Sequence, residues 1–226
     1  MGGAHARVRT RLTDTPPIRD AATIILVRDG PSGPSVLMGQ RGAQAAFMPS
    51  KYVFPGGAVD AGDATIPLAR DLTPDMRVAL TKRSDLVPEA LAVAALRELV
   101  EETGQVLGHP SKQPAPWPGF GSHGPDAAPL RFIFRAITPP MRPRRFDARF
   151  FLAPASALCS DPDDFSAAED ELNHLHWVPL SEARALDMPF ITEVVLAEIS
   201  AIVDGTDAPG VPFFDNSGDT SVFHRL

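Results

Sequence analysis

Residues 88–104 leave little choice of secondary structure. Alanine and leucine dominate residues 89–103, Pro88 suits the first position of a helix, and Gly104 suits the left-handed position that follows one. The apolar residues of this segment recur at helical spacing and form one stripe: Ala92, Val93, Leu96, Leu99 and Val100. We therefore expect a helix over residues 89–103 that is anchored by this stripe.

Three glutamates share the opposite side of this helix. Glu98, Glu101 and Glu102 stand at positions i, i+3 and i+4, which lie close together at 100° per residue. Like charges at i and i+4 destabilise a helix, and Mg²⁺ or Mn²⁺ would offset this because hard cations bind carboxylate oxygens. The alternative is a solvated acidic face in which Arg97 pairs with Glu101.

The rest of the chain alternates extended and helical patterns. We expect a β-hairpin, short extended pieces around a glycine loop, three further strands and a second long helix. These segments are residues 21–27 with 36–38, 52–54 with 58–60, then 130–137, 148–152 and 172–178, and finally 191–203. The interleaving of strands and helices indicates one α/β domain.

Two stretches interrupt this plan and are interpreted as insertions, residues 64–87 and the proline-rich residues 108–129. Loops of this length are either functional covers or flexible excursions. We expect one domain over residues 20–226, preceded by a flexible tail over residues 1–19. The tail carries Arg7, Arg9 and Arg11, which an organellar address would also contain.

Composition restricts the partners. A net charge of −7 argues against a surface that neutralises nucleic-acid phosphates, so we expect a small-molecule ligand. The single cysteine, Cys159, cannot form an intramolecular disulfide, and no apolar run is long enough to span a membrane. We expect a cytoplasmic protein, with a homodimer left open. The ending His224, Arg225, Leu226 distantly resembles a peroxisomal address.

The sequence R-E-L-V-E-E-T-G over residues 97–104 resembles the core of the Nudix box, G-x5-E-x7-R-E-U-x-E-E-x-G-U, in which U is aliphatic. Pro55, Gly56 and Gly57 resemble the loop that precedes the box. The resemblance implies a Nudix-type α/β/α sandwich with a mixed β-sheet and a catalytic loop–helix–loop. It also implies a metal-dependent hydrolase that cleaves a diphosphate linkage in a nucleotide-like substrate.

The box departs from the family pattern in two places. Gln105 stands at the final aliphatic position, with Val106 next. Gly57 and Arg97 are separated by 39 residues where the pattern has 13, so about 26 residues are inserted. The first acid of the box is then either Asp63, with five residues between it and Gly57, or Glu89, with seven residues between it and Arg97.

The resemblance also implies roles for individual residues. Glu98, Glu101 and Glu102 match the metal-binding glutamates, and Gly57 is a candidate to add its main-chain carbonyl. Arg97 completes the catalytic set, where its family role is chiefly structural. The general base is either a glutamate of the box or an acid of a later loop, for which Glu169, Asp170 and Glu171 are the candidates.

Features outside the box suggest the substrate. The insertion and the segments over residues 47–57 and 145–151 resemble coenzyme A diphosphatases, which implies coenzyme A or an acyl ester of it. A nucleotide sugar, a dinucleotide, and a non-catalytic regulator that binds a nucleotide are the alternatives. Arg142, Arg144 and Arg145 are candidates to bind substrate phosphates, or else form a solvated basic loop.

Aromatic side chains outside the box have less specific interpretations. His174 and His176 alternate along a strand and are interpreted as structural or solvent-facing residues. Trp117 is a candidate to stack on a base, although a structural role is favoured.

Overall fold

The computed structural model describes residues 16–45 and 47–226. The strands are β1 (Ile18–Gly30), β2 (Gly33–Arg41), β3 (Tyr52–Val53), β4 (Gly56–Ala58), β5 (Gly108–Pro110), β6 (His123–Pro125), β7 (Arg131–Ile137), β8 (Arg145–Pro154), β9 (Leu172–Pro179), β10 (Pro212–Asp215) and β11 (Val222–Arg225). The α-helices are α1 (Pro74–Thr81), α2 (Pro88–Thr103), α3 (Leu180–Ala183) and α4 (Phe190–Val203), and the 3₁₀ turns are η1 (Asp63–Thr65) and η2 (Ala155–Ala157).

Nine strands form one mixed sheet in the order β11-β10-β7-β8-β1-β2-β3, with β4 paired to β1 and β9 paired to β2. Strands β1 and β8 run parallel, as do β7 and β10, while the other pairs in this sheet are antiparallel. Strand β1 lies between β8 and β2, which places it inside the sheet with both of its edges paired.

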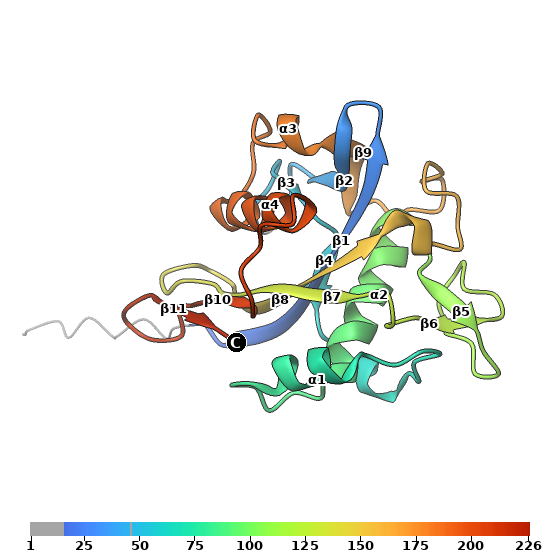
Figure 1. Ribbon diagram of the computed structural model, residues 1–226, viewed down its shortest axis with the longest axis horizontal. Coiled ribbons are helices and arrows are strands. Elements are labelled where there is room, and N and C mark those ends of the chain that lie inside the picture. Colours follow the sequence, from blue (N-terminus) through green and yellow to red (C-terminus); the bar gives the residue numbers. More distant parts are fainter. Residues whose placement is uncertain (1–15, 46) are drawn as a thin grey trace, which may run out of the picture.

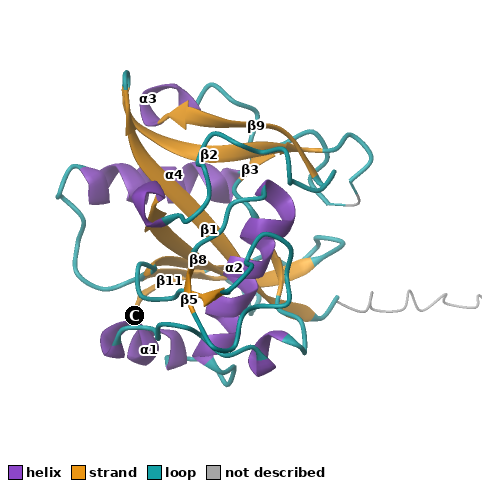
Figure 2. Cartoon of the chain, turned by 90° about the vertical axis from the view of Figure 1, so that its right-hand side faces the viewer, coloured by secondary structure: helices purple, strands orange, loops and turns teal. Residues whose placement is uncertain are grey.

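Each face of the sheet packs against helices. Ile24 and Leu26 of β1 join the apolar cluster that contains residues of α1 and α2, and Ile25 joins the cluster that contains residues of α4. Successive residues of a strand point to opposite faces, so one strand contributes to both clusters. Helix α4 lies on one side of the sheet and α1 and α2 lie on the other (Figures 1 and 2). This arrangement confirms the expected α/β/α sandwich.

The other elements expected from the sequence are present, but the extended piece expected over residues 58–60 is strand β4 at Gly56–Ala58, because the glycines themselves pair with β1. The hairpin is β1–β2, the box helix is α2, and α4 begins one residue before its expected start. Pro88 begins α2 after the N-cap residue Val87, and Gly104 ends it with φ of 72°, the left-handed conformation expected for this glycine. Strand β1 begins at Ile18, two residues before the expected domain boundary.

The two inserted stretches pack against the rest of the domain. Leu72, Met76 and Leu80 are buried in the cluster that contains α2, so residues 64–87 contribute to the core through α1. Thr73 accepts a hydrogen bond from the Met76 main-chain N–H, which caps this helix. In residues 108–129, Phe120 is buried beside Val106. Neither stretch is a loose excursion.

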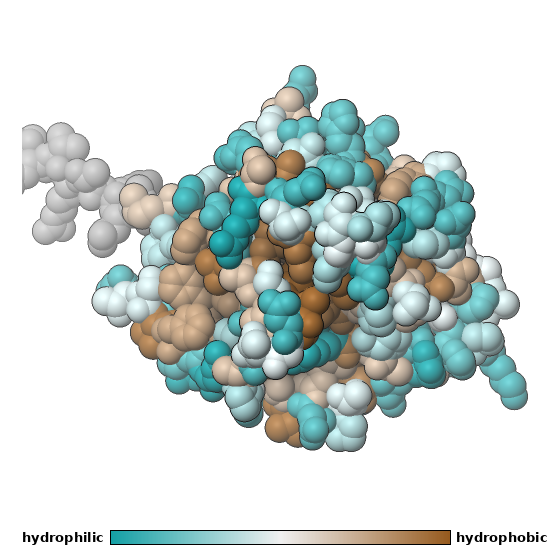
Figure 3. Space-filling view, turned by 45° about the horizontal axis from the view of Figure 1, so that its top comes forward, coloured by the Kyte–Doolittle hydropathy of each residue, from teal (hydrophilic) through white to brown (hydrophobic). Residues whose placement is uncertain are grey.

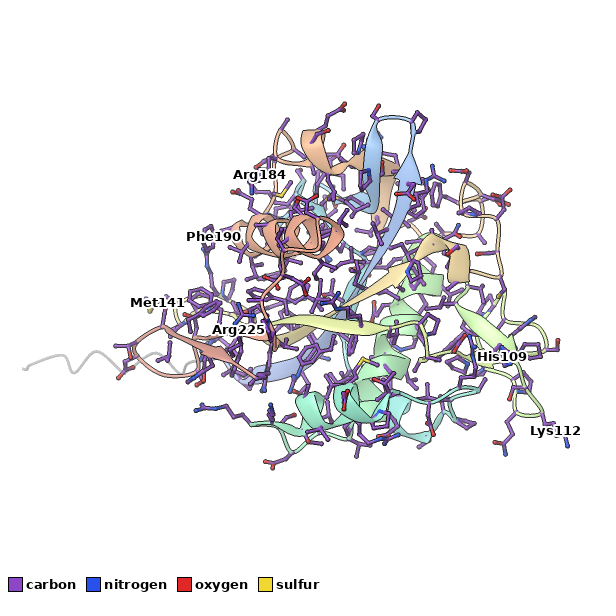
Figure 4. All side chains as sticks on the ribbon, viewed as in Figure 1. His109, Lys112, Met141, Arg184, Phe190 and Arg225 are labelled. Atoms are coloured by element: carbon purple, nitrogen blue, oxygen red, sulfur yellow. The ribbon has the colours of Figure 1, made fainter. Side chains whose placement is uncertain are left out.

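Several features lie at the ends of the molecule. His109 and Lys112, on and next to the β5–β6 hairpin, lie at the end opposite Met141 and Phe190 (Figure 4).

The tail residues Arg7, Arg9 and Arg11 lie outside the described residues. Among the residues that the structure describes, no helix is long and apolar enough to cross a membrane.

Candidate active site

The glycine loop and the box helix meet although 46 positions separate their contacting residues. The main-chain N–H of Gly56 donates a 2.8 Å hydrogen bond to Glu102 Oε2. Gly57 pairs with Ala22 of β1, and a Cβ atom added to Gly57 would overlap the carboxylate of Glu98. Glycine is therefore required here for the close approach of the loop to the helix.

The three glutamates are more enclosed than a surface acidic face would be. Glu102 is buried, the side chain of Glu98 is 12% exposed and that of Glu101 is 31% exposed. The acids do point away from the apolar stripe, as expected, but the loop around Gly57 covers Glu98 and Glu102. A periodic pattern shows where a helix face points and not what packs on it.

Enclosure changes the protonation of two of these acids. Burial raises the pKa of Glu98 to about 7, against the opposing effect of the Arg97 guanidinium. Burial, with the nearby charge of Glu98, raises the pKa of Glu102 well above its ordinary value, while the hydrogen bond from Gly56 lowers it. A divalent cation would stabilise the charged form of both groups.

Arg97 connects the box helix to the loop. Its Nε donates to Asp63 Oδ1 at 2.9 Å and its Nη2 donates to the Ala58 carbonyl at 3.0 Å. Its Nη1 donates to Glu98 Oε1 at 2.8 Å and to Glu101 Oε2 at 2.9 Å. The i, i+4 pair with Glu101 is therefore present together with the box geometry.

The structure separates the two candidates for the first acid of the box. Asp63 is buried and ion-paired with Arg97, whereas Glu89 lies at the start of α2 and pairs with Arg77 of α1. Asp63 thus occupies the place beside the box arginine, and Glu89 connects the two helices. The insertion falls between Asp63 and the rest of the box.

The donor set suits a hard divalent cation. Glu98, Glu101 and Glu102 offer carboxylate oxygens, and the buried Oε1 of Glu102 has no hydrogen-bond partner among the described residues. In residues 16–45 and 47–226, however, no three acidic, histidine or cysteine side chains are gathered as a metal ion would require. Arg97 holds the carboxylates of Glu98 and Glu101, which accounts for their present positions.

A cavity of about 320 Å³ opens beside the glycine loop and is lined by Gly57, Glu98, Arg41, Arg144 and Glu171. A second cleft of about 360 Å³ shares Phe150 and Ile191 with it and has a largely apolar lining. Apolar side chains are visible between hydrophilic ones on the face drawn in Figure 3. The charged residues that line the first cavity therefore lie next to the apolar lining of the second cleft.

The three arginines expected near substrate phosphates have different environments. Arg144 is exposed and lines the first cavity, and Arg142 is exposed and lines the second. Arg145 is buried, and its guanidinium donates to the carbonyls of Thr138 at 3.0 Å and Asn216 at 2.7 Å. The Arg145 guanidinium therefore connects β8 to the neighbouring main chain, and it is not available to bind a ligand.

Of the three later acids, Glu171 lines the first cavity, where it pairs with Arg41 at 2.8 Å. Glu169 is exposed, and its main-chain N–H donates to the Glu101 carbonyl at 2.8 Å, while Asp170 is also exposed. Arg41 also lines this cavity, because the pairing of β2 with β9 brings it beside Glu171.

The remaining aromatic candidates have the environments that were favoured for them. His174 and His176 are exposed on β9, and the side chain of His176 contacts the ring of Tyr52 edge-on. Trp117 packs against Phe120 with 5.3 Å between ring centroids.

The fold is similar to that of solved Nudix hydrolases. The crystal structure of a NUDIX hydrolase from Alicyclobacillus acidocaldarius is 29% identical to this chain, with a TM-score of 0.60, and the match covers 85% of this chain and 94% of that one. No family model matches the sequence.

A curated relative agrees with this assignment. The putative nudix hydrolase 7 of Caenorhabditis elegans is 27% identical, over 73% of this chain and 52% of that protein, so the chain spans about half the length of this relative. The two relatives and the box residues together support placement of the chain in the Nudix hydrolase family.

Proposed function

We propose that this protein hydrolyses a diphosphate linkage in a nucleotide-like substrate with the help of Mg²⁺ or Mn²⁺. The enclosed carboxylates of Glu98 and Glu102, held against the Gly57 loop beside an arginine-lined cavity, support this proposal most directly. Buried acids with raised pKa values are typical of functional sites.

The side chains around the box have two kinds of role in this proposal, metal binding and positioning of the helix. Glu98, Glu101 and Glu102, with the Gly57 carbonyl, would hold the metal, while Arg97 and Asp63 fix the helix against the loop. A bound divalent ion supplies positive charge for the phosphoryl oxygens and lowers the pKa of a water molecule. Water oxygen then bonds to one phosphorus as that phosphorus loses its bond to the bridging oxygen.

The proton released by the water needs an acceptor at the cavity. Glu98 and Glu171 both line it, which supports either a glutamate of the box or an acid of the later loop as the general base. The bridging oxygen leaves with the other phosphoryl group, and the two products separate as phosphate monoesters.

Coenzyme A, free or acylated, is the substrate that we propose. The support is the resemblance of the insertion and of residues 47–57 and 145–151 to coenzyme A diphosphatases, together with an apolar cleft that continues the charged cavity. Arg142 and Arg144 are exposed at these two cavities, where a guanidinium can bind the additional 3′-phosphate of coenzyme A.

A panel of diphosphates tests this function. Purified protein with Mg²⁺ would receive coenzyme A, an acyl-coenzyme A, a nucleotide sugar, a dinucleotide and ADP-ribose, with products identified by mass. We expect coenzyme A to give phosphopantetheine and 3′,5′-ADP faster than ADP-ribose is cleaved. Preference for ADP-ribose would reject coenzyme A while leaving the diphosphatase intact, and binding without any cleavage would favour the nucleotide-binding regulator.

The 3′-phosphate contact has its own test. Replacing Arg142 and Arg144 together by alanine should lower kcat/KM for coenzyme A by about tenfold, and lower it less for 3′-dephospho-coenzyme A, because only coenzyme A carries the phosphate being bound. Equal losses on the two substrates would contradict the contact.

A further inference from the structure

Gln105 follows the glycine that ends α2 and is buried, with an exposed fraction of 0%. It stands where the box pattern has an aliphatic residue, so its carboxamide brings a donor and an acceptor into a place that the pattern keeps apolar. A buried carboxamide is costly unless it is hydrogen-bonded. Its partners come from one stretch of chain, residues 158–171, which connects η2 to β9 and which we call the connecting segment.

Both ends of the carboxamide are hydrogen-bonded to the connecting segment. Nε2 of Gln105 donates to the Asp164 carbonyl at 2.8 Å, and Oε1 accepts from the Ser160 hydroxyl at 2.8 Å. Ser160 Oγ also accepts from the Val106 N–H at 3.0 Å. An aliphatic side chain could make neither of the two carboxamide bonds. Gln105 therefore links two points of the connecting segment to the end of the box helix.

Further contacts place the same segment against the last turn of α2. The Glu169 N–H donates at 2.8 Å to the carbonyl of Glu101, one of the carbonyls that have no partner inside the helix. A Cβ atom added to Gly104 would lie 3.0 Å from the Cβ of Ala167, so the segment packs directly on the helix end. Phe165 packs against the apolar cluster that contains α2.

The connecting segment ends at the cavity beside the box. Glu171 is its last residue, lines this cavity together with Glu98, and pairs with Arg41 at 2.8 Å. The Glu171 side chain is 54% exposed, so its position depends chiefly on the main chain that carries it. A displacement of about 1 Å in a group that acts on substrate can cost on the order of a hundredfold in rate.

The burial of Gln105 distinguishes it from the other polar contacts of the segment. The ion pair of Arg28 with Asp163 also holds the segment, but these side chains are 30% and 65% exposed, and such pairs contribute little. A hydrogen bond that is shielded from water is stronger, and its loss leaves polar groups unsatisfied. Without the carboxamide, Ser160 and Asp164 would have to turn to water, which favours movement of the segment away from the helix.

We propose that Gln105 is a positioning residue that fixes the connecting segment to the end of the box helix and thereby holds the Glu171 carboxylate at the cavity. The box helix then positions two sets of acids, its own glutamates directly and Glu171 through Gln105. The part of this inference in which Glu171 acts on substrate rests on the proposed function.

Hydrogen exchange tests the attachment without relying on turnover. Amide exchange would be measured by mass spectrometry for the wild type, Gln105→Met and Gln105→Leu. Methionine keeps the length of the side chain without its hydrogen bonds, and leucine is an aliphatic residue of the kind in the box pattern, so both should fold. Peptides from residues 160–171 should exchange at least about tenfold faster in both variants, while those from α4 should not change. Unchanged exchange over residues 160–171 would overturn the attachment.

Kinetics tests whether the attachment serves Glu171. On a diphosphate that the wild type cleaves, Gln105→Met should lower kcat by about tenfold and change KM by less than about twofold, because it displaces a group that acts on bound substrate. Glu171→Gln should lower kcat at least as much, and the double variant should be no slower than Glu171→Gln alone. Losses that multiply in the double variant, or full activity of either single variant, would overturn the positioning role.

Leu80→Ala is the control for a general loss of stability. Leu80 is buried on α1 and not in the connecting segment, so its truncation should destabilise the fold while kcat stays within about twofold of wild type. The two kinds of measurement also separate this inference from the proposed function. If the wild type cleaves no diphosphate while Gln105→Met still speeds exchange over residues 160–171, the hydrolase proposal fails and the attachment is retained.

Discussion

Glu102 shows how one side chain is shaped by two distant parts of the chain. It belongs to α2, yet one of its oxygens accepts from Gly56 and the other has no hydrogen-bond partner in the part of the chain that the structure describes. Burial of a carboxylate that is only half satisfied is costly unless a cation completes it. A cation bound at this carboxylate would offset that cost, which supports the proposed metal site.

We expect Glu98→Gln, Glu101→Gln and Glu102→Gln each to lower kcat by about a hundredfold or more, because each removes a charge that would hold the metal. Steady-state kinetics at saturating Mg²⁺ measures this effect, and circular dichroism checks that each variant is folded. Glu193→Gln, at an exposed position of α4, is the control and should be fully active. Near-normal turnover of all three box variants would show that the metal site lies elsewhere.

Substitution of Asp63 should lower the free energy of unfolding much more than substitution of Glu89. Asp63→Asn leaves the largely buried Arg97 without its main counter-ion and should lower the free energy of unfolding by about 3 kcal/mol. Glu89→Gln breaks a more exposed pair with Arg77 and should cost less than about 1 kcal/mol. Urea denaturation measures both, and equal costs would refute the assignment of Asp63 as the partner of the box arginine.

At the scale of elements, β4 and α2 form the site by direct contact. Gly57→Val should reduce activity by at least about tenfold, because its side chain would occupy the space of the Glu98 carboxylate. Gly62→Val is the matched control, since a Cβ at Gly62 meets no atom within 4 Å. The measurement is kcat/KM of each variant relative to that of the wild type. A fully active Gly57→Val protein would show that the reaction does not depend on this loop.

Helix α1 belongs to the inserted stretch, and its attachment to the core can be measured. Leu80 is 2% exposed and packs in the cluster that contains α2, so Leu80→Ala should lower the free energy of unfolding by about 2–4 kcal/mol. Val78, which is 60% exposed on the same helix, should cost less than about 0.5 kcal/mol when changed to alanine. Equal, small losses would mean that the insertion contributes little to the core.

At the scale of the whole molecule, metal binding should stabilise the fold. At a concentration of Mg²⁺ or Mn²⁺ about a hundred times its Kd, the free energy of unfolding should rise by about 2.7 kcal/mol, which raises Tm by roughly 5–10 °C in a domain of this size. Removal of the metal with EDTA should reverse the shift, and Glu98→Gln should show little of it. A Tm that does not depend on the metal in the wild type would contradict the proposed metal site.

The arrangement of α2 could be predicted from the sequence by itself. Helical periodicity is a local property, so the spacing of Ala92, Leu96 and Leu99 indicated one buried face, and Gly104 indicated where the helix ends. In the structure residues 90–96 are all buried, so the first half of α2 is covered on every side. The three glutamates follow from the same periodicity, and the hairpin follows from a β-branched run on either side of a turn. These are contacts between near neighbours in the chain.

Only the tertiary structure decided which distant residues meet. The choice of Asp63 over Glu89 required the position of η1 relative to α2, and the enclosure of Glu98 required the packing of the Gly57 loop. The Arg145 guanidinium binds main-chain carbonyls and not the cavity. Arg41 lies at the cavity because of the register in which β2 pairs with β9. Such contacts depend on how sheet and helices pack together, which no window of sequence contains.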